Sequence, residues 1–227
     1  RMEQTLRAVI EPLAALERGA GSPGERQAAD MLAGMFRDAG ADSVRIDEET
    51  FRGESYARVL LPLGLAGFAG SLVVRRHPLL GATLAALAAA ATVDEAENGR
   101  RWWRKAAFGE QTTWNVVAEC GDLGADRTLV VLAHHDAAAT GTMFDQSLQK
   151  WLARRFPDIV ARTDTALPIW WPVVAGPLAT IASALTGSRR LARAGRALGA
   201  VTIAAAADIA RHRTMPGAND NLSACAA

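Results

Sequence analysis

Apolar side chains recur every three or four positions through the first forty residues, which is the spacing of a helix with one buried face. This spacing predicts one helix that ends at Gly19 and a second that ends at Gly40. The second helix has a defined start, because the Ser22 hydroxyl can accept a hydrogen bond from a free backbone amide while Glu25 reaches back. Pro23 also suits the first helical position. The amino-terminal region is therefore expected to form two consecutive helices.

Three later segments have the pattern of β-strands. Residues 44–46 alternate between apolar and polar, and residues 113–120 are rich in Trp and Val. Residues 128–133 form a continuous apolar run, which is typical of a strand covered by helices on both faces. The sequence therefore predicts an α/β fold, in which a mixed, largely parallel sheet is sandwiched by helices.

Two long uncharged stretches do not belong to a simple α/β unit. The first covers residues 59–93 and is broken only by a basic turn at 75–77, and the second covers 166–207 with a similar basic turn. Each pattern predicts an apolar helical hairpin that leaves the α/β part and returns to it. We expect these hairpins to lie in insertions at about 59–105 and 141–213.

The hairpins have two interpretations. A helix needs about 20 apolar residues to cross a bilayer, and most of these segments are shorter, which favours a helical cap over the active-site face. Tryptophans mixed with arginine and lysine at 100–105 and 150–155 favour a membrane interface instead. On the membrane interpretation, residues 59–93 and 166–207 make the contact, and the protein is membrane-associated or extracytoplasmic. Arginines lie at both ends of the hairpins. The enrichment of positively charged residues in cytoplasmic loops therefore gives no orientation of the hairpins across a membrane.

The composition narrows the classes of function. The chain has 227 residues, of which 25 are Lys or Arg and 24 are Asp or Glu, so its net charge is +1. Nucleic-acid binding is not expected, because it needs a strongly basic surface. Half of the residues are hydrophobic, which is too many for a disordered chain, and two cysteines are too few for a disulfide framework.

Candidate chemistry follows the apolar segment 128–133. His134 and Asp136 are two residues apart, so both can point to one side of a loop, where an imidazole can bind zinc while the carboxylate holds its other nitrogen. His135 is the alternative ligand, but Asp136 would then be adjacent to it. A second loop at 216–224 is rich in Asn and Asp. Taken alone, each loop is more consistent with an ordinary turn or a helix cap than with a metal site.

Three segments taken together carry a resemblance. They are the helix entry at 18–32, the strands and loop at 113–136, and Gly217-Ala218-Asn219-Asp220-Asn221-Leu222-Ser223-Ala224. In this order they resemble the zinc-dependent aminopeptidase family of co-catalytic metallopeptidases, whose relatives include glutamate carboxypeptidase, glutaminyl cyclase and the transferrin receptor. The resemblance implies a phosphorylase/hydrolase-like zinc exopeptidase fold, here incomplete, with residues 1–227 forming one partial peptidase domain.

The same resemblance implies roles for single residues. His134 would bind one zinc, Asp136 would act in catalysis by orienting His134, and Asp220 would bridge two zinc ions. Asn219 and Asn221 would hold the second loop. Two such ions, about 3.5 to 4 Å apart, activate a bridging hydroxide that attacks a carbonyl group. The implied activity is removal of the amino-terminal residue from a peptide substrate.

The family pattern continues after the second metal loop with a Glu-Glu pair, another acidic ligand and a histidine, whereas this sequence stops at Ala227. We therefore expect the chain to be an amino-terminal portion of a peptidase, with weak or no metal binding and no turnover by itself. Two alternatives stay open: a catalytically dead, membrane-associated binding or scaffold domain, and a glutaminyl-cyclase-like zinc acyltransferase. A bridging Asp220 favours two metals over the single metal of a cyclase. The sequence gives no oligomeric state.

Overall fold

The computed structural model describes residues 2–53, 56–122, 124–141, 147–162, 171–211 and 213–226. The chain divides into two compact units, each built from segments that are separated in the sequence. We call the first the sheet unit and the second the helical unit. The sheet unit comprises Arg1–Ser55, Phe108–Thr140 and Arg213–Ala227, and the helical unit comprises Tyr56–Ala107 and Gly141–His212.

The sheet unit opens with the two predicted helices, α1 (Met2–Ala14) and α2 (Pro23–Asp38). α1 ends at Ala14, before the predicted end at Gly19, and Arg18 in the segment that follows binds other parts of the chain. The predicted cap of α2 is confirmed, since the Ser22 hydroxyl accepts a hydrogen bond from the Glu25 amide at 3.1 Å. The Glu25 carboxylate in turn accepts from a backbone amide at 2.5 Å, which completes the cap.

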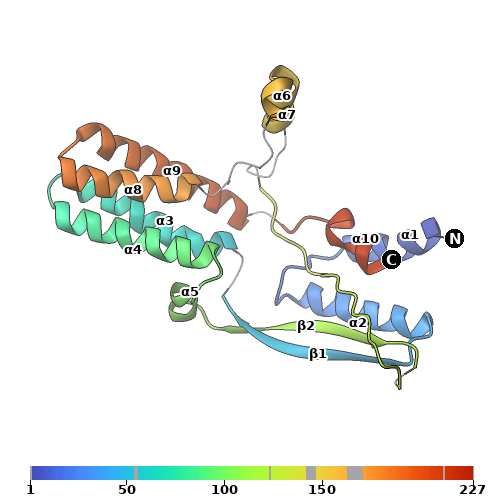
Figure 1. Cartoon of the computed structure of the whole chain (residues 1–227). Helices are drawn as coiled ribbons and strands as arrows, with labels where there is room; N and C mark the ends of the chain where they lie inside the picture. Colours follow the sequence, from blue (N-terminus) through green and yellow to red (C-terminus); the bar gives the residue numbers. More distant parts are fainter. Residues whose placement is uncertain are drawn as a thin grey trace. The chain divides into compact units, whose positions relative to one another are not determined.

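Two strands form an antiparallel ribbon, β1 (Ser43–Arg52) and β2 (Glu110–Glu119), paired from Ser43↔Glu119 to Arg52↔Glu110. They contain most of the predicted strands 44–46 and 113–120 and extend them, and α2 lies along them (Figure 1). A small core joins α1, α2 and the turn η2 (Ala218–Leu222), which leads into α10 (Ser223–Ala226). Its buried side chains are Val9, Leu13, Ala28, Leu32 and Leu222.

The predicted parallel sheet sandwiched by helices is wrong. Across the described residues the sheet has only two strands, they are antiparallel, and the protein is mainly helical. Residues 128–133 are not a strand, and the side chains from Leu129 to Leu132 are 70 to 88% exposed. An apolar run forms a buried strand only where other strands pair with its edges and helices cover its faces. Within the described ranges, no strand pairs with this segment.

The helical unit contains both predicted hairpins. α3 (Tyr56–Val73) pairs with α4 (Pro78–Ala96), and α8 (Trp171–Thr186) pairs with α9 (Arg189–Arg211). The two hairpins pack against each other, so the four helices lie side by side (Figure 1). Residues 142–146, 163–170 and 212 of the second predicted insertion lie outside the described residues. Shorter helices complete the unit: α5 (Trp102–Ala107), α6 (Ser147–Arg155) and α7 (Pro157–Ala161).

Candidate functional site

His134 and Asp136 lie in the extended segment that follows β2 in the sheet unit. His134 Nδ1 is 3.1 Å from Asp136 Oδ1, which is a hydrogen-bonding distance. About half of the His134 side chain is exposed, so the imidazole is held by the carboxylate while it stays open to solvent. The expected relation between the two side chains, with the carboxylate on one ring nitrogen, is therefore present.

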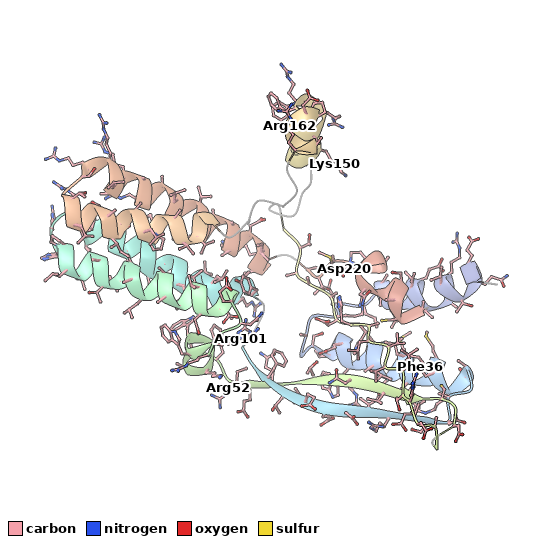
Figure 2. All side chains as sticks on the ribbon, viewed as in Figure 1. Phe36, Arg52, Arg101, Lys150, Arg162 and Asp220 are labelled. Atoms are coloured by element: carbon pink, nitrogen blue, oxygen red, sulfur yellow. The ribbon has the colours of Figure 1, made fainter. Side chains whose placement is uncertain are left out.

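Asp220 approaches the same imidazole from the other end of the sequence. It lies in η2, immediately before α10, and its side chain is largely exposed (Figure 2). Its Oδ1 atom is 3.2 Å from His134 Nε2, although the two residues are 86 positions apart. The peptide bond between Asp220 and Asn221 is cis. The structure thus brings together His134, Asp136 and Asp220, with one carboxylate on each ring nitrogen.

The electrostatics of His134 reflect these neighbours. Partial burial, the largest single influence, lowers the pKa of His134, but the charge of Asp136 and the hydrogen bonds to both carboxylates outweigh it. The net result is a pKa above the ordinary value for histidine. The two carboxylates thus favour the protonated form of the imidazole. A metal ion would compete with a proton at Nε2, because only the neutral ring is a ligand.

A buried arginine joins the two loops. Arg18 is fully buried, and its Nη1 donates to the carbonyl of His135 while its Nη2 donates to the carbonyl of Pro216 at 2.5 Å. The backbone adds a further link, since the Ala137 amide donates to the Arg18 carbonyl at 2.7 Å. Burial lowers the pKa of Arg18, yet arginine keeps its charge in proteins. Arg18 therefore fixes the loop of His134 relative to the loop of Asp220.

Further links lie beside Arg18. The Glu17 carboxylate accepts from the amide and the hydroxyl of Thr214 at 3.1 and 3.0 Å, and Ala139 forms an isolated antiparallel bridge with Thr214. The buried Glu25 accepts from the hydroxyl of Thr113 on β2. These contacts attach the segment just before the second loop and the start of α2 to their surroundings. The roles of Arg18 and Glu17 were not predicted from the sequence, where the one signal is an adjacent charged pair just before a helix cap.

The remaining predicted loop residues contribute less. Asn219 and Asn221 both lie in η2, so their backbones form the turn that carries Asp220. The side chain of Asn219 is outside the described part of the structure. Leu222 is fully buried in the core and anchors the end of this turn.

Two other side chains near the site have different environments. His135 is buried, burial lowers its pKa, and within the described residues its Nε2 atom has no hydrogen-bond partner. It is thus His134, and not His135, that lies beside Asp220. Cys225 Sγ donates to the His134 carbonyl at 3.4 Å, and burial raises the pKa of this thiol. A neutral thiol is a poor nucleophile and a poor metal ligand, so Cys225 has the features of a packing residue.

Comparison with known proteins adds no relative. A scan against protein-family models, a search of curated proteins and a search of solved structures each found no match.

Proposed function

We propose that the sheet unit carries part of a zinc site for peptide hydrolysis, of the kind used by zinc-dependent aminopeptidases. The observation that carries the proposal is the placement of the His134 imidazole between Asp136 and Asp220. Two loops that are distant in the sequence are held together by the buried Arg18 so that these three side chains meet. This arrangement supports a shared ligand role better than two independent turns.

The donor atoms fit zinc as part of a ligand set. Imidazole nitrogen and carboxylate oxygen bind zinc at about 2.0 to 2.2 Å, so two ligands of one tetrahedral ion lie about 3.3 Å apart. The distance between His134 Nε2 and Asp220 Oδ1 is 3.2 Å. A protein zinc site uses three or four ligands, and the described residues contain no cluster of three that could hold a metal. We therefore assign His134 and Asp220 as two members of a larger set.

Each side chain has a separate task in this proposal. Asp136 would accept a hydrogen bond from Nδ1 of His134, which would fix the tautomer and leave Nε2 available to an ion that Asp220 also binds. Asp220 supplies a negative charge that would offset the charge of the ion. Arg18 positions both loops without touching the ligands. Bound zinc would supply a Lewis acid that activates water and polarises the scissile carbonyl.

Zinc binding tests the site directly. A zinc titration of the protein, followed through the NMR signals of its imidazole protons, is expected to shift one histidine in a saturable way. That signal should disappear in His134→Ala, and the apparent affinity should fall at least tenfold in Asp220→Ala. The matched controls are the exposed residues His77 and Glu49, whose replacement by alanine should leave the titration unchanged. Equal apparent zinc affinities of the wild type and Asp220→Ala would contradict the proposal.

Hydrolysis separates the peptidase from a second candidate, a catalytically dead binding domain. That candidate is favoured by one observation, that no third metal-binding side chain joins the cluster among the described residues. Hydrolysis of a leucyl anilide by a zinc-loaded protein that also carries the Glu-Glu pair, acidic ligand and histidine of the family pattern, lost in Asp220→Ala, would support the peptidase. Saturable zinc binding by such a protein without any hydrolysis would favour the binding domain.

A further inference from the structure

The helical unit has many large apolar side chains on its outside and mostly small residues on its inside, although Val59, Leu60, Leu63, Val74 and Val174 are also buried. A helix bundle that folds in water shows the opposite distribution, because burying large apolar side chains is what stabilises it. The exposed set is Leu65, Leu72, Leu79, Leu80, Leu87, Leu178, Leu185 and Val201. The buried set consists mainly of Gly, Ala, Ser and Thr, including Gly64, Gly67, Gly70, Ser71, Gly81, Ala85, Ala88, Thr92, Thr180, Gly195, Gly199 and Thr202.

Length and composition agree with this distribution. Among the described residues, α3 and α4 are long and apolar enough to cross a membrane, and α8 contains a shorter apolar helix. A core helix of a water-soluble protein passes the same test, but it is mostly buried. Only 44% of the apolar window of α3 and 39% of that of α4 is buried, so most of each window faces outward.

The small residues bring the helix backbones close together. A Cβ atom at Gly70 would lie 2.8 Å from the carbonyl oxygen of Gly81, and one at Gly195 would lie 3.0 Å from that of Gly176. Gly195 and Gly199 are four residues apart on α9, the spacing that allows helices to pack closely in membranes. Side-chain size inside the unit is therefore limited by contact between helices.

Several buried hydroxyl groups are satisfied within their own helices, whereas the buried Thr202 Oγ1 has no hydrogen-bond partner among the described residues. Thr92 Oγ1 donates to the carbonyl of Ala88 at 2.8 Å, and Thr180 Oγ1 donates to that of Gly176 at 3.1 Å. These hydrogen bonds need no water, so the polar groups are compatible with an apolar surrounding.

One end of the helical unit is strongly basic. Arg75 donates to the carbonyl of Gly187, so the turn between α3 and α4 lies next to the turn between α8 and α9 (Figure 1). No Asp or Glu occurs in residues 74–77 or 187–196. The two segments carry six exposed arginines, namely Arg75, Arg76, Arg189, Arg190, Arg193 and Arg196. Clusters of four to eight such cations beside apolar helices are typical of binding to anionic lipid headgroups.

We propose that α3, α4, α8 and α9 insert together into a lipid bilayer, with the two arginine-bearing turns against anionic headgroups. The helices have 18, 19, 16 and 23 residues, which at 1.5 Å per residue corresponds to about 24 to 35 Å, comparable with a hydrocarbon core of about 30 Å. Arg193 and Arg196 lie in the first turns of α9, within reach of the headgroups. The bilayer is the partner that matches both the apolar surface and the basic end.

The first experiment measures how a newly introduced charge affects retention of the protein in the membrane, depending on the depth of the charge in the bilayer. Expressed in bacteria, the wild-type chain is expected to stay in the membrane fraction after an alkaline carbonate wash. Leu87→Asp, in the middle of α4, should reduce the retained fraction at least tenfold, whereas Leu79→Asp, beside the basic turn, should retain most of it. Recovery of the wild type as a detergent-free soluble monomer or dimer would overturn the proposal. The measurement on the wild type does not depend on how the variants fold.

The second experiment isolates the headgroup contact. Purified protein is floated with vesicles of phosphatidylcholine alone or with phosphatidylglycerol added, and at least tenfold stronger binding to the anionic vesicles is expected. Arg76→Glu with Arg190→Glu should abolish the preference, and the preference should fall as salt is added. The control, Arg37→Glu with Arg127→Glu, changes the net charge equally at exposed sites in the sheet unit. Equal binding of the wild type to both vesicles would overturn the headgroup assignment.

Discussion

Arg18 is a fully buried cation whose two terminal nitrogens bond to backbone carbonyls rather than to a carboxylate. Hydrogen bonds from a charged donor are stronger than those from a neutral one, and a buried carbonyl that loses its partner is destabilising. The position of His134 relative to Asp220 thus depends on a residue that touches neither of them. Stability and zinc affinity are expected to change together when Arg18 changes.

Replacement of Arg18 by alanine should lower the free energy of unfolding by about 2 to 4 kcal/mol, because the carbonyls of His135 and Pro216 lose their donor. The free energy of unfolding of Arg18→Lys should lie between those of the wild type and Arg18→Ala, since one ammonium group does not reproduce the two hydrogen-bonding arms of the guanidinium. The measurement is a urea titration. Arg37→Ala, an exposed arginine on α2, is the control and should change the value by less than about 0.5 kcal/mol. An unchanged midpoint in Arg18→Ala would contradict this role.

Gly217 is a second residue on which the turn of Asp220 depends. Its φ is +63°, and a Cβ atom there would lie 2.9 Å from the carbonyl oxygen of Asp220 and 3.0 Å from Arg18 Nη2. Gly217→Ala should therefore destabilise the fold by about 2 to 3 kcal/mol and weaken zinc binding. Gly40 is the matched control, since its φ is +93° and the space around it is open. Gly40→Ala should lower the free energy of unfolding by about 1 kcal/mol, because the positive φ is then the only source of strain, and zinc binding should be unchanged.

At the scale of elements, predictions succeeded where the deciding interactions are local. The start of α2 follows from Ser22 and Glu25, which bond to amides only a few residues away. Residues 128–133 were predicted wrongly, because a strand needs partners that no local pattern can supply. The meeting of His134, Asp136 and Asp220 was expected only through a family resemblance, and the contacts of Arg18 depend on the fold. The four-helix packing also escaped prediction, since uncharged stretches show helices but not their neighbours.

The exposure of residues 128–133 leads to a test at this scale. Leu132 is 87% exposed, so Leu132→Ala should change the free energy of unfolding by less than about 0.5 kcal/mol. Leu32, on α2, is buried in the core, and Leu32→Ala should lower the value by about 2 to 5 kcal/mol. Both are read from urea titrations. A loss above 2 kcal/mol in Leu132→Ala would show that this segment is covered in solution.

At the scale of the whole molecule, the two units differ in what stabilises them. The sheet unit relies on a small apolar core and long-range hydrogen bonds, and the helical unit on close helix contacts. A ligand of one unit should therefore protect that unit first. At a zinc concentration one hundred times the dissociation constant, the expected stabilisation is about 2.7 kcal/mol.

Hydrogen exchange followed by mass spectrometry measures this protection segment by segment. Zinc should slow exchange in β2 and in residues 218–226, by up to about 100-fold, while leaving α3 and α4 unchanged. Asp220→Ala should remove the effect. Equal slowing in α3 and α4 would show instead that the two units open as one.

The contact between Arg18 and Pro216 also sets an order of events during synthesis. The two residues are 198 positions apart, so at about 5 to 20 residues per second the ribosome needs roughly 10 to 40 seconds to make the second after the first. Both apolar hairpins emerge within that interval. The nascent chain therefore contains both complete hairpins before Arg18 can fasten the loop of His134 to the loop of Asp220.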